Sequence, residues 1–430
     1  MTTKITSDNI ATSVPLGTEW QAVKTANYTA VAGQGIFCNT TGGAFTVTLP
    51  ASPTIGDEVT IVDYAGTFAT NNLTIARNGS PMDGNAADSV LDAHGTNVRF
   101  VYIDGTKGWT AVFDDLPTEL GATYIAATGG TESTSGNYKI HTFNSSSNFV
   151  VSQIGNPGGG PSVVDYLVVA GGGGAGGSGY TGGGGGYGSG AGGAGGYRES
   201  KSPVAGTYTA SPLATPTGIT VTSQTYPITI GAGGSGGPTP APSLPAQIGA
   251  NGSPSVFSTI TSTGGGGGAG ATTNGQDGGS GGGKSNEGAA GSGNTPPVSP
   301  SQGNNGGTTD GNGNIGGGGG GGAGGAGGQG GASPSPAAGG TGGAATTSEI
   351  NGSPTARAGG GGGGGGKDAP ASAPGGSATG GGGAGASTGN AGSAGTANTG
   401  GGGGASGGNP GKTGGAGGSG IVILRYKYQN

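Results

Sequence analysis

Apolar and polar residues alternate along several short segments near the start of the chain. In Phe45–Leu49 every second residue is apolar, as expected for a strand with one buried face. Other strand-like segments are Glu58–Asp63, Asn72–Arg77, Asn97–Asp104 and Gly108–Phe113. Gly, Pro and Asn residues separate these segments, which predicts an all-β sandwich or barrel over residues 20–116. Residues 1–19 precede it as an N-terminal arm, and almost no α-helix is expected anywhere.

Two strongly apolar segments lie further along the chain. Val163–Val169 and Ile421–Tyr426 are nearly continuous apolar runs, typical of buried strands. They bracket a long glycine-rich region, so we expect them to pair side by side and to close that region at its base. Residues 117–164 are predicted to hold a linker and a β-hairpin, with strands at Asn137–Phe143 and Asn148–Ser152.

Glycine dominates the second part of the chain. Of the 116 glycines, 100 lie in residues 151–430, whereas an ordinary globular protein contains roughly 7% glycine. Non-glycine residues in some runs are spaced three apart: Ala191, Ala194, Tyr197; Ala323, Ala326, Gln329, Ala332; and Thr413, Ala416, Ser419. Three residues per turn is the period of the polyproline II helix, which has no internal hydrogen bonds. With glycine on two faces, neighbouring backbones can approach and bond to one another.

Residues 165–430 are therefore predicted to form a bundle of polyglycine II helices closed by β-strands. A disordered Gly/Ser linker is the alternative from composition, and a collagen helix is a weaker one because collagen needs one glycine per triplet and abundant proline. The recurrence of the runs, their triplet phase and the flanking strands favour the bundle. The same phase predicts that valine at Gly324 or Gly325 is worse tolerated than a change at Ala326.

Segments rich in Pro, Ser, Thr and Asn separate the glycine runs. They are Arg198–Thr229, Pro238–Thr263, Lys284–Asn305, Ser333–Ala358 and Lys367–Pro374. If each run is a rod, these segments are turns at rod ends, and loops on a rigid scaffold are where binding residues usually lie. The candidate contact residues are Tyr197, Arg198, Tyr208, Tyr226, Phe257, Lys284, Arg357 and Lys367. Packing between loops is the alternative role for the aromatic side chains.

Composition excludes several classes of function. Only 8% of residues are charged and the formal net charge is −6, so there is no basic stripe for nucleic acid. No apolar stretch reaches about 18 residues, so we expect no membrane insertion. Cys38 is the single cysteine, which excludes an internal disulfide framework, and it makes no metal-ligand spacing with His94 or His141.

Apparent chemical motifs have simpler explanations. Gly278–Ser285 fits a P-loop pattern, but neither the strand nor the helix that a P-loop requires flanks it. Asp310–Asn314 resembles the start of a calcium loop, yet Gly321 occupies the place of the bidentate glutamate. No pair of carboxylates has a spacing that indicates acid/base catalysis. We therefore expect neither an enzyme nor a bound metal or cofactor.

The two bracketing segments carry a family resemblance. Asp165–Gly174, together with Gly418–Tyr426 at the far end, resembles the glycine-rich domain of phage structural proteins. The alternation of glycine runs with variable loops is similar to the fibre-tip adhesins of T-even-type phages, which fold as layered polyglycine II bundles and bind host receptors through tip loops. This resemblance covers about residues 125–430. Residues 20–115 more loosely resemble a β-domain of marine phage virion proteins, and the adhesins lack this domain.

The resemblance implies a virion structural protein assembled in the host cytoplasm, as a tail fibre or receptor-binding adhesin. Its partners would be a host-surface glycan or outer-membrane protein and other virion proteins, with the N-terminal domain serving docking or oligomerisation. Phage fibres are usually trimeric and the fibre-tip adhesins monomeric, so a homotrimer stays open. The alternatives are a capsid decoration or head-fibre protein and, from another class, a bacterial surface or matrix protein. The N-terminus lacks the apolar run of a signal peptide, which favours the virion hypotheses.

Overall fold

The computed structural model describes residues 17–115, 123–156, 159–178, 186–239, 247–270, 272–310, 315–332, 337–367, 372–408 and 411–429. The described residues contain strands and extended glycine segments but no helix, which confirms the all-β prediction. The chain divides into two compact units, residues 1–123 with 155–160, and residues 124–154 with 161–430.

The first unit is a β-sandwich. Its strands are β1 (Glu19–Lys24), β2 (Tyr28–Thr29), β3 (Gln34–Cys38), β4 (Phe45–Thr48), β5 (Glu58–Asp63), β6 (Leu73–Ala76), β7 (Ser89–Leu91), β8 (Asn97–Asp104) and β9 (Gly108–Asp115). One sheet has the order β1-β3-β5-β8-β9 and the other β2-β4-β6-β7. The first three strands of each sheet run parallel, and the remaining pairings are antiparallel. Neither sheet closes into a barrel, so the sandwich alternative of the prediction holds.

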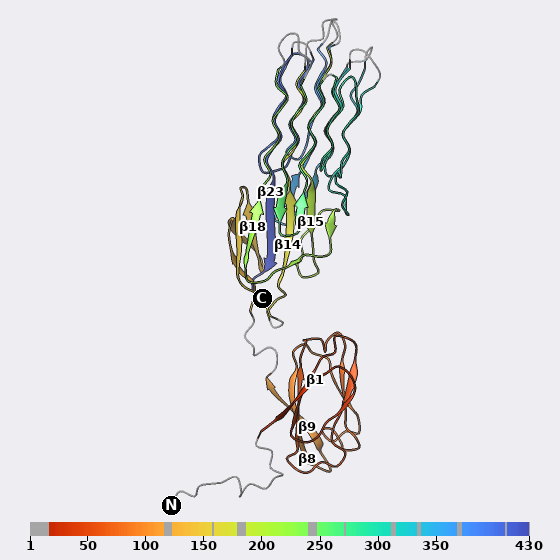
Figure 1. Cartoon of the computed structure of the whole chain (residues 1–430), viewed down its shortest axis with the longest axis vertical. Helices are drawn as coiled ribbons and strands as arrows, with labels where there is room; N and C mark the ends of the chain where they lie inside the picture. Colours follow the sequence, from red (N-terminus) through yellow and green to blue (C-terminus); the bar gives the residue numbers. More distant parts are fainter. Residues whose placement is uncertain are drawn as a thin grey trace, which may run out of the picture. The chain divides into compact units, whose positions relative to one another are not determined.

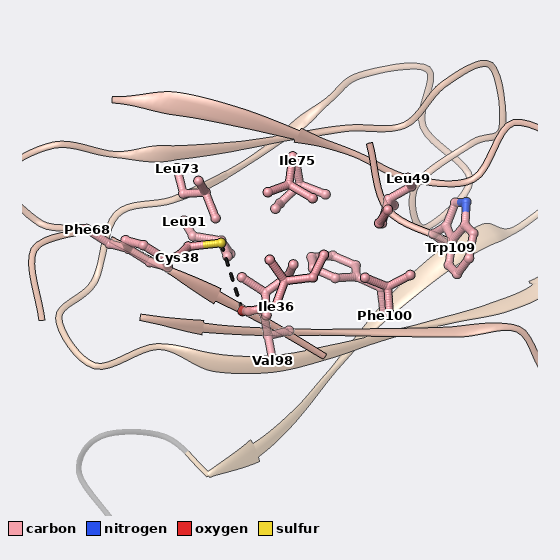
Figure 2. Close-up of a cluster of buried hydrophobic side chains, with 14 of the residues drawn as sticks. Ile36, Cys38, Leu49, Phe68, Leu73, Ile75, Leu91, Val98, Phe100 and Trp109 are labelled. Carbon is pink, nitrogen blue, oxygen red and sulfur yellow. Dashed lines mark hydrogen bonds between the residues drawn. The ribbon is translucent and has the colours of Figure 1, made fainter. Parts of the chain in front are cut away.

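The core of this sandwich follows from the alternation in its strands. Phe45 and Val47 of β4 and Val59 and Ile61 of β5 belong to the core at every second position, while Thr60 between the last two is buried on the opposite face of the sheet. Figure 2 shows the inward-pointing side chains of the two sheets meeting one another, with the thiol of Cys38 near the carbonyl oxygen of Ile36. The strands β4, β5, β6, β8 and β9 lie where the pattern predicts them. The pattern did not predict β1, β2, β3 and β7.

The second unit joins a strand-rich base to the glycine segments. Its first strands are β10 (Ala126–Thr128), β11 (Thr131–Ser135), β12 (Tyr138–Phe143), β13 (Ser147–Gln153), β14 (Val163–Val169) and β15 (Tyr197–Ser200). The others are β16 (Ala214–Thr215), β17 (Ile219–Thr220), β18 (Thr225–Thr229), β19 (Ser255–Phe257), β20 (Ile260–Ser262), β21 (Thr346–Ser348), β22 (Thr355–Arg357) and β23 (Ile421–Lys427).

The two apolar runs pair as predicted. β14 and β23 are antiparallel neighbours at the centre of the sheet β11-β12-β23-β14-β15-β16, and β17 also pairs with β14. A second sheet has the order β10-β13-β18-β19-β20, and β21 pairs with β22 in a separate hairpin. Because β14 and β23 are covered on both faces, their apolar residues are buried almost without interruption.

The predicted hairpin at Asn137–Ser152 is wrong. β12 pairs with β11 and β23, whereas β13 pairs with β10 and β18, so the two strands belong to different sheets. The chain crosses between the sheets because this brings Phe143 and Phe149 into one core, with ring centroids 6.4 Å apart. The strands of residues 126–153 therefore belong to the glycine-rich unit and not to a linker.

The glycine segments form rods that bond to one another through their backbones. In residues 170–178, successive N–H groups donate in strict rotation to three neighbouring segments, residues 190–196, 247–253 and 412–418. The donors that face residues 190–196 are Ala170, Gly173 and Gly176, bonding to the carbonyls of Gly196, Gly193 and Gly190. Residues 188–196 repeat this pattern toward residues 315–321, 400–406 and 263–269. A three-residue period with every bond made to another segment is the arrangement predicted for polyglycine II.

These rods extend from the strands of the base, as Figure 1 shows for the segments beyond β14, β15 and β23. We call the end at Val169, Tyr197 and Ile421 the base end, and the end at Ser178 and Lys412 the distal end. Ala191 and Ala194 on the third face of one rod are fully buried, and Ala191 contacts Ala175 and Ala405 in a small apolar cluster. The alanine methyl groups on the third face of this rod therefore fill space between neighbouring rods.

One run does not keep a single phase. Residues 315–332 fold back on themselves, with Gly319 donating to Gly328 and Gly322 donating to Gly325. The residues spaced three apart from Ala323 onward therefore lie on both sides of a turn and do not share one face of a single rod. A Cβ at Gly325 would meet only Ala344, at 3.6 Å, so the predicted intolerance of Gly325 to a side chain is wrong. A Cβ at Gly324 would lie 2.5 Å from the carbonyl oxygen of Ala345, which agrees with the prediction for that position.

Candidate functional site

The turns between rods fall into two groups, at opposite ends of the bundle. Since residues 170–178 run from β14 toward the distal end and residues 188–196 return to β15, alternate turns lie at opposite ends. Arg198–Thr229, predicted to be a contact loop, lies at the base end and contributes β15 to β18 to the sheets. Lys284 and Lys367 belong to the distal group, because their backbones bond near the distal ends of other rods.

Five of the eight candidate contact residues are buried. They are Tyr197, Tyr208, Tyr226, Phe257 and Arg357. All five lie in or beside the strands of the base, where the two large hydrophobic clusters of this unit lie. A buried side chain cannot contact a receptor, so the structure corrects the prediction for these residues. Arg198 is half-buried on β15, where its backbone pairs with Val168.

Tyr226 and Phe257 belong to an aromatic cluster between the sheets. Their ring centroids are 6.1 Å apart, and Phe149 lies within 6.4 Å of both rings. The Tyr226 hydroxyl accepts a hydrogen bond from the backbone N–H of Thr222 at 2.8 Å. Because the glycine rods contain few large side chains, these rings supply much of the apolar burial of the base.

The base also contains buried carboxylates with complete hydrogen bonding. Asp165 accepts bonds from the hydroxyl of Ser200 and from the N–H and hydroxyl of Ser202, at 2.6–2.9 Å. Glu199 accepts from the hydroxyl of Tyr197 at 2.9 Å, and from the N–H of Ser211 and the hydroxyl of Ser348. Both acids are 1% exposed, so their bonds hold three chain segments together at the base.

Two buried arginines complete this cluster. The guanidinium of Arg425 lies between the rings of Tyr138 and Tyr208, 4.6 and 5.0 Å from their centroids, and Nε donates to the carbonyl of Ala205 at 3.2 Å. Burial lowers the pKa of Arg425 and of Arg357, while the neighbouring Tyr and acidic groups oppose the shift. Burial, reinforced by the charge of Glu199, raises the pKa of Tyr197 and of Tyr208. The cluster is closed to solvent and acts in packing.

Half-buried and exposed side chains lie at the distal end of the rods. Lys284 and Lys367 are half-buried there, and their N–H groups donate to Gly307 at 2.9 Å and to Gly186 at 2.7 Å. Lys412 is exposed and Tyr187 half-buried at the same end. The sequence pattern did not single out either residue. Successive rods run in opposite directions from Val163–Val169, and this alternation would have indicated that both residues lie at the distal end.

Neither a metal site nor a membrane-spanning helix is found in the described part of the chain. No group of three or more His, Cys, Asp or Glu side chains there could hold a metal ion. None of its segments forms a helix long and apolar enough to cross a membrane.

Comparison with protein-family models adds to this geometry. A family model described as a glycine-rich domain matches residues 157–427, which is more than half of the chain. This span begins shortly before β14 and ends with the last residue of β23, so it coincides with the rods and the two strands that close them. No curated protein matches the sequence.

Proposed function

Because the chain belongs to the glycine-rich domain family, we propose that it is a structural protein of a bacteriophage particle that presents host-contact loops on a rigid scaffold. The rotation of backbone hydrogen bonds among the rods carries the proposal. Every N–H from Gly188 to Gly196 bonds to another rod, so the scaffold holds together without disulfides and with few large side chains. Such a scaffold suits a protein that must endure outside a cell.

The division of the rod ends supports contact at the distal end. Glycine rods offer almost no side chains with which to discriminate between ligands, and the base end is filled with strands and buried aromatic residues. Contact with a host-surface glycan or outer-membrane protein is therefore assigned to the distal end, where Tyr187, Lys284, Lys367 and Lys412 lie. Weak contact at each copy would suffice, since several copies on one particle add avidity.

A cell-binding assay tests this function directly. The purified full-length chain should bind to cells of the host and slow adsorption of phage that carry it. Reversing charge at the distal end, with Lys367→Glu and Lys412→Glu together, should reduce cell binding at least about fivefold, whereas Lys107→Glu, at an exposed lysine of the first unit, should not. Protein that binds no cells would contradict the proposal. Gold-labelled antibody found over the whole capsid would favour the decoration alternative.

A further inference from the structure

One rung of the first unit, a row of residues paired across neighbouring strands, places chemically distinct side chains on the outward face of its five-stranded sheet. Trp20, Gly35, Thr60 and Arg99 are successive partners across β1, β3, β5 and β8. On β5 the residues that flank Thr60, Val59 and Ile61, point into the core, so Thr60 points outward. The rung therefore aligns an aromatic ring, a bare backbone position, a hydroxyl and a guanidinium on one surface.

Trp20 is held flat on this surface. Its ring stacks on Phe37, with centroids 4.7 Å apart and planes inclined by 18°, and it lies over Gly35, where a Cβ would collide with it. Half of Trp20 is nevertheless exposed, at 50%. An indole ring that is fixed on one face and open on the other loses little conformational entropy when a ligand covers it.

A cavity of about 360 Å³ lies near this ring, although Trp20 is not one of its lining residues. Polar side chains of Thr18, Gln34, Asp57, Glu58 and Thr60 line it together with glycine backbone, and Ile55 is the only large apolar residue among its lining residues. Thr18 links the cavity to the ring, because its methyl group and the Trp20 ring both lie over Gly35. Glu58 is held by Arg99, whose guanidinium is 3.4 Å from the carboxylate.

We propose that this face binds a saccharide, with the Trp20 ring against the C–H face of one sugar and the cavity groups bonded to its hydroxyls. The electron-rich face of an indole attracts the partly positive C–H groups of a sugar ring. Hydroxyls need both donors and acceptors, which the Thr hydroxyls, the Glu58 carboxylate and the glycine backbone supply. A protein segment would instead need an apolar cavity for its anchor residues.

This proposal goes beyond host contact by the distal loops, because it assigns a second binding activity to a different unit. Fluorescence tests it with the full-length chain. Of the two tryptophans, Trp109 is fully buried, so acrylamide quenching reports on Trp20. The probes are chito-oligosaccharides, gluco-oligosaccharides and galacto-oligosaccharides. At least one series should protect Trp20 from acrylamide in a saturable manner and shift its emission to shorter wavelength.

Variants separate binding from folding. By calorimetry with the protective series, Trp20→Ala should weaken affinity at least about tenfold, and Trp20→Phe should retain part of it. Glu58→Gln, which leaves the aromatic stack intact, should weaken affinity as well. Val23→Ala is the matched control, an exposed residue of the same strand away from the rung. Absence of protection by all three series, or equal affinity of Trp20→Ala and the native chain, would overturn the proposal.

Discussion

Asp165 and Arg425 are direct partners across the ladder of β14 and β23, and both side chains are buried. Asp165 is bonded to Ser200 and Ser202, while Arg425 lies between two tyrosine rings and donates to backbone carbonyls. The two opposite charges thus occupy one rung of the strands that close the glycine rods. This rung joins the strand that precedes the rod region to the strand that follows it.

Replacement of Asp165 should therefore be costly. Asp165→Ala leaves three buried donors without an acceptor, at about 1–3 kcal/mol each, and removes a charge that favours the ionised form of Arg425. Glu132→Ala is the control, because its pair with Lys139 lies at the surface and contributes at most about 1 kcal/mol. Denaturant unfolding at pH 8, followed by circular dichroism, measures both. Equal losses in the two variants would show that the rung is not important for stability.

His141 should make stability depend on pH. Its Nδ1–H donates to the Gly129 carbonyl at 2.7 Å, and its Nε2 accepts from the Tyr426 hydroxyl at 2.9 Å. Burial lowers the pKa of His141, with Lys139 acting in the same direction and Glu132 opposing it. The unfolded chain then takes up a proton near pH 6.5, while the folded chain does so only at lower pH. Stability should therefore fall as the pH drops below about 6.5.

Thermal melting at a series of pH values checks this dependence, and an NMR titration of the imidazole gives the pKa directly. A stability that stays constant from pH 7 to pH 5 would contradict the expectation. So would an imidazole of His141 that titrates above its ordinary pKa of about 6.5.

Strands with a clear period of two could be predicted from sequence, and others could not. Glu58–Asp63 and Asn97–Asp104 were predicted with the bounds that the structure shows. β3 was missed because Gly35 interrupts its apolar alternation, and that glycine is required beneath the Trp20 ring. The separation of β12 and β13 into two sheets depends on long-range pairing with β23 and β18, which the local pattern does not contain.

The rods were predictable because backbone chemistry and a period of three suffice for them. The end of the bundle at which each loop lies was not predictable, because it depends on how many rods precede that loop. Turns inside glycine runs, as at Ala323–Gly325, have no distinctive residues. Tyr208 and Tyr226 were predicted as contact residues because they lie in loop-like segments. They are buried because the base is where a glycine-rich unit can remove large rings from water.

Cys38 should be inert in the folded chain. Burial, with a smaller contribution from the charge of Asp63, raises the pKa of its thiol to about 12. Since the thiolate is the reactive form, a disulfide reagent at pH 8 should leave the native protein unlabelled and label it fully after denaturation. The appearance of labelling with denaturant then reports on the opening of the first unit. Rapid labelling of the native chain would show that the core around Cys38 opens readily.

The rods should be protected against hydrogen exchange despite their composition. Each N–H from Gly188 to Gly196 donates to a neighbouring rod, and these residues are almost entirely buried. An unfolded glycine segment has no such bonds and exchanges at the rate of a random coil. Mass spectrometry of peptic fragments should show slow exchange for residues 188–196 and fast exchange for the exposed residues around Ser353. Fast exchange in both would contradict the bonded bundle.

A comparison of two glycines tests why the rods need glycine. Gly192 lies inside the bundle, where a Cβ would collide with the backbone carbonyl of Gly173, and its N–H donates to Gly403 at 2.9 Å. Gly192→Ala must push two rods apart, which leaves several backbone groups unpaired at about 1–3 kcal/mol each. Gly325→Ala at the turn meets only an ordinary contact at 3.6 Å and should change the unfolding free energy by less than about 1 kcal/mol. Both variants add the same methyl group. A lower melting temperature for Gly192→Ala than for Gly325→Ala would therefore show that the close approach of the rods stabilises the bundle. Equal melting temperatures would show that the close approach of backbones is not what stabilises the bundle.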